Sequence, residues 1–589
     1  MNTCPLLITA AAILAASCSD GGSSSTAATD ANTDTAGTSE TTTTTEGTTV
    51  GTTAGTSEGT TEGTTAGTGS DSETTDTETD TTTDGEPGVV RVVYRKESAP
   101  DFVEIFAVDV VDGMVGAPMK VNLDPVGDES LSTLLRSSQD RRWLAYEMVS
   151  ESMMGRNLHL ADLHAPGTVT QVTVAPAPEY GTVIETRFSD AAELLIFSAR
   201  ADQDSGTDIF MVSLEGGQPG PTVRLNPATS PSDGVGGFTV SPDGTRIAYT
   251  GSIDDGVANA YLQNANTTDP GAPVLVSDNV DPAIAVGPAE WLDDDWILYR
   301  SDVDDDGIRE VFVVDVSGAP KTPIFFDPGD TVTVRGPGMA PDMRGFAYFA
   351  GDGSYGDLYF APFDGASFGA ATLVNTIGPG GDVFSKEFAW SPDSSWLVYS
   401  AQHNTPMVRE AFAVDMSGGA PATPIQVNGP LVPNGEINTM RISPEGAQLY
   451  YTAEQDSDSL ELYRASLQPG QVGPDERVHA QTIDNSTEII FEGEDWLMIT
   501  GQIDGGVNQE LFYVDLQAAP LTAEVVNAPH PDAGVKFGAE VSPSGRVIVY
   551  SAGIDPETIY LVDREGAGLG SSIEVAADVM FGITAVLEP

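Results

Sequence analysis

The sequence predicts an all-β protein: a β-propeller of four-stranded blades, about ten of them, preceded by a disordered stalk. Three observations predict this class. A turn phrase recurs along the chain, the strands between the turns are apolar on both faces, and residues 19–88 are almost free of large apolar side chains. No amphipathic helix of useful length interrupts the strands that follow.

The recurring phrase is Ser-Pro-Asp-Gly between two short strands, seen most clearly at Ser241 to Gly244. Proline presets φ at the second turn position, aspartate bonds nearby backbone, and glycine releases the chain into the next strand. Equivalent serines are separated by 52, 150, 52 and 99 residues, at Ser189, Ser241, Ser391, Ser443 and Ser542. These separations are multiples of one period near 50 residues, which indicates a repeat architecture.

Each repeat holds four strand candidates. Around Ser391 they are Phe388–Trp390, Trp396–Ser400, Glu410–Asp415 and Pro424–Asn428. Third strands such as Glu310-Val-Phe-Val-Val-Asp are apolar on both alternating faces. A strand with one wet face alternates apolar and polar residues, so these strands lie between two layers. Four-stranded sheets stacked face to face around an axis satisfy that requirement.

Residues 1–18 form the first segment. The apolar run Leu6–Ala16 is too short to cross a bilayer and fits the core of a signal peptide. It ends in Leu-Ala-Ala-Ser-Cys18, which resembles the bacterial lipoprotein signal. The resemblance implies that Cys18 is lipidated and becomes the mature N-terminus of an envelope protein. The expected location is lipid-anchored in the cell envelope, in the outer membrane, facing the periplasm or the surface.

Residues 19–88 form the second segment, rich in Thr, Gly, Ser, Asp and Glu. This composition lacks the apolar side chains that offset the entropy of ordering a chain, so we expect a disordered linker. Both cysteines, Cys4 and Cys18, precede it, which excludes disulfides and thiol chemistry from the remainder. The net charge of −63 makes nucleic-acid binding very unfavourable. The oligomeric state is left open by the sequence.

Residues 89–589 form the propeller. The first repeat lacks an inner strand, and Phe581–Leu587 is a strand left over after the last repeat. Pairing these two segments would complete one blade from both ends of the chain and remove two exposed edges. The count of about ten exceeds the common four to eight blades, so either one large ring or two smaller tandem rings is expected. Trp291 and Trp390 fall on inner strands, where we expect them to fill the interfaces between blades.

The repeat resembles the TolB-like, WD40-like (PD40) repeat on two motifs: Ser-Pro-Asp-Gly-Thr-Arg-Ile-Ala-Tyr at Ser241, and Glu-apolar-Phe-x-Val-Asp in the third strand. Similar blades occur in the propellers of prolyl oligopeptidase and tricorn-type proteases. The resemblance covers nearly all of residues 89–589 and implies the fold. It implies little about function, because such blades serve as scaffolds, gates and binding platforms.

An acidic loop is the candidate metal site. Asp302, Asp304 and Asp306 stand at alternate positions before Gly307, the order found in calcium loops. Three carboxylates on one sharp turn can converge on a hard cation, so these residues form a tentative calcium site. No other cofactor is expected. No bidentate glutamate stands at the twelfth position, which Val313 occupies, and Asp-Gly is also an ordinary hairpin turn.

The function expected from the sequence is non-catalytic. With no Ser/His/Asp order, phosphate loop or His-rich motif, no catalytic residue is predicted. The first hypothesis is a binding or scaffolding platform for a protein, peptide or glycan, with the ligand-binding residues unknown. The alternatives are a hydrolase or lyase acting on polysaccharide or peptide in the propeller channel, and a calcium-dependent adhesion or structural module.

Overall fold

The computed structural model describes the chain from Gly88 to Glu588 with internal gaps. Residues 87–589 form one compact unit. The predicted signal peptide and, apart from Gly88, the predicted linker lie outside the described residues, which are 88–99, 102–150, 155–172, 182–189, 191–200, 206–230, 233–253, 256–266, 269–277, 286–302, 309–319, 322–326, 334–350, 355–375, 383–402, 408–479, 483–491, 495–503, 509–527, 535–553, 557–565 and 568–588.

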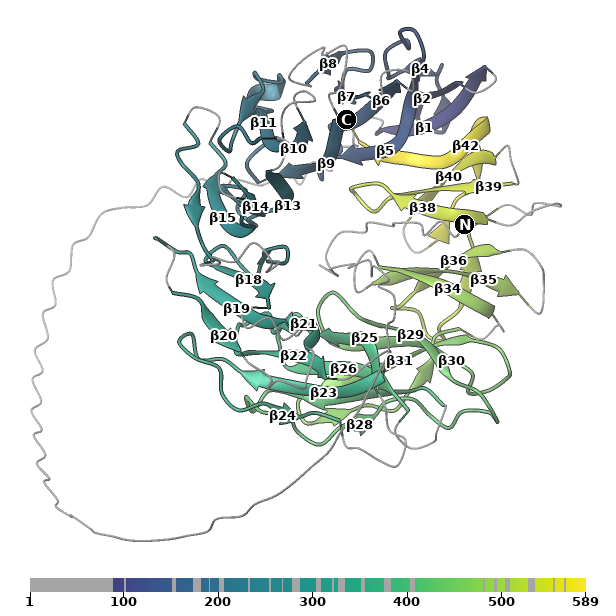
Figure 1. Ribbon diagram of the computed structural model, residues 1–589. Helices are drawn as coiled ribbons and strands as arrows, with labels where there is room; N and C mark the ends of the chain where they lie inside the picture. The colour runs from purple at the N-terminus through teal and green to yellow at the C-terminus, as the bar shows by residue number, and fades with distance from the viewer. Residues whose placement is uncertain are drawn as a thin grey trace, which may run out of the picture. The chain divides into compact units, whose positions relative to one another are not determined.

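The described strands form ten antiparallel blades arranged around a centre (Figure 1). In each blade the first strand lies toward the centre and the fourth, usually only two or three residues long, lies at the rim. From the centre outward, blade 1 consists of β42 (Ile573–Leu587), β1 (Val89–Ala99) and β2 (Phe102–Val111), with the short strands β3 (Met114–Val115) and β4 (Met119–Lys120) outside β2. Blade 2 consists of β5 (Glu129–Ser137), β6 (Trp143–Ser150), β7 (Gly155–Asp162) and β8 (Val169–Gln171). Blade 3 consists of β9 (Thr182–Ser189), β10 (Leu194–Arg200), β11 (Thr207–Ser213) and β12 (Val223–Arg224).

Blades 4 to 7 follow the same order. Their strands are β13 (Gly234–Val240), β14 (Arg246–Ser252), β15 (Asn259–Asn264), β16 (Val274–Leu275); β17 (Glu290–Trp291), β18 (Trp296–Ser301), β19 (Glu310–Asp315), β20 (Ile324–Phe326); β21 (Val334–Met339), β22 (Gly345–Ala350), β23 (Tyr355–Pro362), β24 (Thr372–Leu373); and β25 (Val383–Trp390), β26 (Trp396–Ala401), β27 (Glu410–Asp415), β28 (Ile425–Gln426).

Blades 8 to 10 complete the set. Their strands are β29 (Ile437–Ile442), β30 (Gln448–Ala453), β31 (Glu461–Gln468), β32 (Gln471–Val472), β33 (Glu476–Arg477); β34 (Ile483–Phe491), β35 (Trp496–Ile503), β36 (Glu510–Asp515), β37 (Ala523–Val525); and β38 (Val535–Val541), β39 (Val547–Ala552), β40 (Glu557–Glu565), β41 (Gly568–Leu569). The helical element described is a 3-10 turn, η1 (Glu215–Gly217), between β11 and β12.

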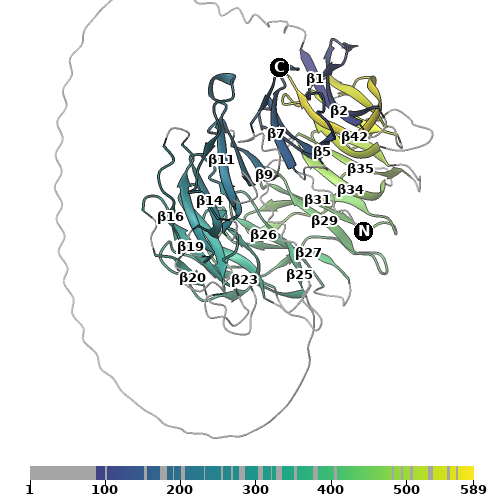
Figure 2. The same ribbon diagram turned by 45° about the horizontal axis from the view of Figure 1, so that its top comes forward.

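The blades pack face to face, as the apolar pattern predicts. Val311, Phe312, Val313 and Val314 of β19 are all buried, so both faces of that strand are covered. The view tilted by 45° shows neighbouring blades stacked along the ring (Figure 2). Burial on both sides of the middle strands supplies most of the apolar area that stabilises the fold, at roughly 25 cal/mol per Å² removed from water.

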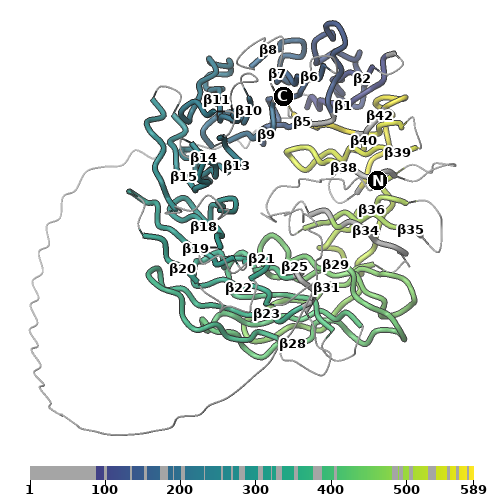
Figure 3. Tube along the Cα trace, viewed as in Figure 1, coloured from purple at the N-terminus to yellow at the C-terminus, as the bar shows by residue number. Residues whose placement is uncertain are grey.

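Ten apolar clusters of described residues join the blades, and each cluster contains residues of two neighbouring blades. The decisive cluster packs Val549 and Leu561 of blade 10 against Val90 and Val108 of blade 1. The clusters therefore close a single ring, and the chain runs round it once from purple to yellow (Figure 3). Of the two arrangements left open by the sequence, the single ring is correct.

The strand β42 closes the ring. Its C-terminal half pairs with β1, from Arg91 with Leu587 to Lys96 with Val579, as the unpaired segment at the end of the sequence predicts. Its N-terminal half also pairs with β40, where Leu561 lies opposite Ile573. Blade 1 is thus completed by both ends of the described chain, and the contact between blades 10 and 1 is a continuous sheet.

A side-chain acceptor ties the outer part of seven of the described blades. It lies just after the fourth strand and accepts a hydrogen bond from a backbone N–H near the start of the third strand. The acceptors are Asn122, Asn226, Ser277, Asn375, Asn428, His479 and Asn527. Because the fourth strands are short, this contact satisfies a buried amide that their own ladder leaves without a partner.

Candidate functional site

The residues predicted from sequence do not come together as a site. Cys18, Asp304 and Asp306 lie outside the described residues, and Asp302 follows the end of β18. Within the described ranges, no group of three or more His, Cys, Asp or Glu side chains is placed to hold a metal ion. The calcium site therefore stays a prediction. No helix among the described residues is long and apolar enough to cross a membrane.

The Ser-Asp pair of the recurring turn is structural. Ser138 Oγ donates a 2.5 Å hydrogen bond to Asp140 and accepts one from the N–H of Trp143, 2.9 Å away. The same arrangement holds Ser241 with Asp243 and Ser391 with Asp393. Since each hydroxyl is engaged in closing its own turn, these serines are not free nucleophiles.

The two inner-strand tryptophans fill interfaces, as expected. Trp291 is buried, and its indole N–H donates to the carbonyl of Thr239 in the preceding blade, 3.3 Å away. Trp390 donates in the same way to Gly338, 3.0 Å away. Both rings pack in clusters that join two blades.

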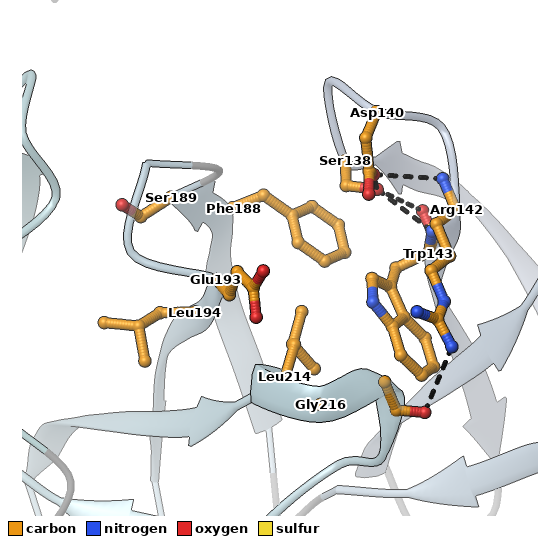
Figure 4. Close-up of a pocket in the computed structure, with 11 residues that line it drawn as sticks. Ser138, Asp140, Arg142, Trp143, Phe188, Ser189, Glu193, Leu194, Leu214 and Gly216 are labelled. Atoms are coloured by element: carbon orange, nitrogen blue, oxygen red, sulfur yellow. Dashed lines mark hydrogen bonds between the residues drawn. The ribbon is translucent and has the colours of Figure 1, made fainter.

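A pocket of about 390 Å³ lies between blades 2 and 3. Its lining comes from the β5–β6 turn, the end of β9 with the β9–β10 turn, and the segment after β11. The lining residues are Ser138, Asp140, Arg142, Trp143, Phe188, Ser189, Glu193, Leu194, Leu214, Gly216 and Gly217. Figure 4 shows Phe188, Trp143 and Leu214 as the apolar walls, with the Glu193 carboxylate at the side opposite Arg142. The volume lies in the range of pockets that bind small ligands.

Arg142 forms one end of the pocket. Its Nη2 donates to Asp162 Oδ2 and to the carbonyl of Gly217, both 3.2 Å away, and its guanidinium lies 5.1 Å from the ring centroid of Trp143. A Cβ at Gly217 would overlap that guanidinium, so this approach requires glycine. Arg142 thus links blade 2 to blade 3 and covers one face of Trp143.

Glu193 forms the other end. It lies in the β9–β10 turn with a φ of +47°, and its side chain is exposed. Its backbone carbonyl accepts a hydrogen bond from Leu214 at 2.8 Å, which fixes the turn against the pocket floor. Among the described residues no hydrogen bond or ion pair engages its carboxylate. The pocket therefore combines an available carboxylate, a guanidinium and apolar walls.

Two half-buried carboxyls lie on inner strands elsewhere in the ring. Burial raises the pKa of Glu290 on β17 and of Glu540 on β38, with Arg300 and Arg141 respectively opposing the rise. Blades 5 and 10 hold these groups, so they lie far from one another along the ring. They do not form the pair of facing carboxyls that glycoside hydrolysis requires.

Sequence reasoning missed the pocket. Trp143, Phe188 and Leu214 are ordinary apolar residues in their own segments, and the fold alone brings them together. One signal was present. Glu193 occupies the turn position where equivalent repeats have Thr245, Ser395 and Arg546.

The fold and the pocket define a ten-bladed β-propeller with a cleft between two adjacent blades. No family model and no curated protein matches the chain. Solved structures do resemble it. A prolyl endopeptidase is 12% identical over 66% of this chain and 55% of its own, with a TM-score of 0.31. A eukaryotic initiation factor is 14% identical over 75% of this chain and 97% of its own, with a TM-score of 0.42. A puromycin-hydrolysing peptidase of Mycobacterium tuberculosis is 13% identical over 73% of this chain and 59% of its own, with a TM-score of 0.31.

Two of these three solved structures are peptidases, a finding that contradicts the prediction of a non-catalytic binding platform. The prediction that the protein is not an enzyme is withdrawn with it. The chain spans 55% and 59% of those two peptidases, and at TM-scores of 0.31 the likeness assigns no activity to it. The all-β propeller expected from the resemblance is confirmed, whereas no family model supports TolB-like repeats.

Proposed function

We propose that the protein is a hydrolase that acts on peptides and that the pocket between blades 2 and 3 receives the substrate. The observation that supports this proposal is the Glu193 carboxylate, exposed and without a described partner at the edge of an apolar pocket. A carboxylate in that state can serve as a general base. In the proposed step it takes a proton from a water whose oxygen attacks the peptide carbonyl carbon. The C–N bond then breaks, and the same proton passes to the leaving nitrogen.

A peptide suits the pocket better than a polysaccharide. The walls of Phe188, Leu214 and Trp143 are apolar, and the Arg142 guanidinium already covers one face of Trp143. Sugar binding relies on stacked rings with several free polar groups around them. Here Asp140 and Arg142 are engaged with Ser138 and Asp162 inside the protein. An apolar side chain of a peptide can pack against these walls without hydrogen bonds from Asp140 or Arg142.

Cleavage of a peptide pool tests this proposal. The full protein is incubated with a degenerate mixture of unblocked octapeptides, and new termini are identified by mass spectrometry. The wild type should yield discrete cleavage products, E193Q should lose at least about 100-fold in rate, and E215Q should keep the wild-type rate. Glu215 is a matched control, since it is exposed on η1 next to the pocket but does not line it. Equal rates for wild type and E193Q would refute the role of Glu193, and the absence of cleavage by wild type would refute the function.

We also propose that the repeats are of the TolB-like kind and that the chain is exported and anchored through Cys18. The Ser-Pro-Asp-Gly turns and the apolar run before Cys18 support these assignments. Fractionation of cells that express wild type or Cys18→Ala tests the anchor. The wild type should sediment with membranes and the variant should not. Retention of the variant in the membrane pellet would refute lipid anchoring.

A further inference from the structure

Arg141 occupies a turn position that favours glycine. Equivalent positions hold Gly244, Gly446 and Gly545, with φ of +73°, +78° and +71°. Arg141 takes the same left-handed conformation, with φ of +56°. A residue with a Cβ is strained there, as are Ser394 and Met343 at the same position of their turns, with φ of +60° and +62°.

The side chain of Arg141 makes contacts with blades 1 and 10. Arg141 Nη1 donates to the carbonyl of Val586 in β42, 2.6 Å away, and to the carbonyl of Val541 at the end of β38, 3.0 Å away. Its Nη2 lies 3.3 Å from a carboxylate oxygen of Glu540. A side chain of blade 2 thus holds the two strands that meet where blades 10 and 1 close the ring. By comparison, Arg344 reaches only the next blade, at the carbonyl of Met416.

The turn that carries Arg141 also forms a wall of the pocket. Ser138, Asp140 and Arg142 of this turn line it, and Arg141 lies between the last two in sequence. The turn is internally tied by the N–H of Arg141 to the carbonyl of Ser138 at 2.9 Å. A shift of Arg141 therefore moves the segment that positions Arg142 over Trp143.

We propose that Arg141 is a positioning residue that joins the pocket to the closing contact of the ring, so that the shape of the pocket depends on closure. When the hydrogen bonds from Arg141 to the carbonyls of Val541 and Val586 are lost, the 138–142 turn is no longer held, and the wall of the pocket that blade 2 provides is displaced. The contact with the ring stands on the geometry alone. Its effect on catalysis rests on the proposed function.

Hydrogen exchange followed by mass spectrometry tests the contact on the full, ligand-free protein. R141G removes the side chain and the backbone strain together, so any loosening it causes comes from lost contacts. Exchange should rise about tenfold in two segments, 138–143 and 573–587. M343G is the matched control, because Met343 has φ of +62° at the same turn position in blade 6. It should leave both segments unchanged.

The second readout is kinetic. With a peptide cleaved by the wild type, R141G should raise KM about tenfold while kcat falls less than about twofold, since the variant misplaces the substrate wall and leaves Glu193 intact. R141K keeps the charge beside Glu540 but cannot bond two carbonyls in a fork, so it should fall between R141G and wild type in both readouts. Unchanged exchange in both segments for R141G would overturn the proposal. If the wild type cleaves no peptide, the exchange experiment still decides the contact.

Discussion

The hydroxyl oxygen of Tyr146 in blade 2 accepts a hydrogen bond from the backbone N–H of Leu123 in blade 1, 3.1 Å away. Leu123 directly follows Asn122, the residue that ties the outer part of its own blade. Tyr249 holds the same place in blade 4. In the preceding blade 3 the tying residue is Asn226, and the residue that follows it is Pro227. Proline has no N–H to donate, and the buried Tyr249 hydroxyl is without a partner among the described residues.

These two tyrosines should respond differently to loss of the hydroxyl. Y146F removes the acceptor of the Leu123 backbone N–H and should destabilise the ring by about 1 kcal/mol. Y249F removes a buried hydroxyl that makes no bond and should be neutral or stabilising. Chemical denaturation of both variants measures the difference. A larger loss of stability for Y249F than for Y146F would contradict this account of the interface.

The half-buried carboxyl of Glu290 should make stability fall as pH rises. Burial raises its pKa in the folded state, so the unfolded chain ionises first when pH rises above the ordinary value for glutamate. Between that value and the raised folded pKa, unfolding is increasingly favoured. E290Q removes this effect and should raise Tm by about 1–2 °C at pH 7, with the difference vanishing near pH 4. A scan of Tm against pH for both proteins gives the answer.

Asp243 is a control for that scan, because its pKa is lowered and its effect on stability should change with pH in the opposite direction. Burial acts to raise its pKa, but hydrogen bonds from Ser241 and Thr245 outweigh burial and lower the pKa. Its contribution to stability is present above the ordinary aspartate value and is lost as pH falls through the lowered folded pKa. D243N should therefore lower Tm at pH 7 and approach the wild type in acid. Parallel curves for D243N and E290Q would show that the assigned signs are wrong.

The two glycines of η1 should differ in their tolerance of alanine. Both have positive φ, +70° for Gly216 and +73° for Gly217. A Cβ at Gly216 meets no atom within 4 Å, whereas one at Gly217 would overlap the Arg142 guanidinium. G216A should cost about 1 kcal/mol of stability from backbone strain alone. G217A should cost more and should also displace Arg142 from Trp143, visible as weaker peptide binding. Equal binding by both variants would show that Arg142 does not shape the pocket.

Ending the chain at Asp578 should unfold the ring rather than trim it. The truncation removes the part of β42 that pairs with β1, and it exposes Val92 and Val93, which are fully buried in the intact protein. That loss is comparable with the whole stability of a typical folded domain, about 5–15 kcal/mol. Circular dichroism and gel filtration should report an unfolded or aggregated chain. E588A, which removes only the bonds to Ser544, should remain folded.

The sequence was sufficient to predict the blades and the closing strand, because both depend on local patterns. Apolar residues on both faces of segments such as Val311–Val314 require covering layers on both sides, and stacked blades provide them. The number of rings needed the structure, since the apolar cluster that decides it combines residues of blade 1, such as Val90, with residues of blade 10, such as Leu561. Spacing along the chain does not show which blades meet.

The pocket was beyond prediction for a related reason. Its walls come from three segments that are each ordinary in isolation, and only the fold shows which of its charged groups are engaged by other residues. Asp140 and Glu193 are both acidic residues of a turn. Ser138 donates a hydrogen bond to the Asp140 carboxylate, whereas no described residue engages the Glu193 carboxylate. Besides Glu193, Arg141 was a local hint, because the equivalent turns of blades 4, 8 and 10 have glycine at its position.

The pairing of β1 with β42 has a consequence during synthesis. Arg91 and its partner Leu587 are 496 residues apart, so at roughly 5–20 residues per second a ribosome needs about 25–100 s to supply the second after the first. Throughout that interval β1 presents an open backbone edge, which is prone to pairing with other chains. The first blade made is consequently the last to be finished, and a newly made chain depends on protection of that edge until its final strand arrives.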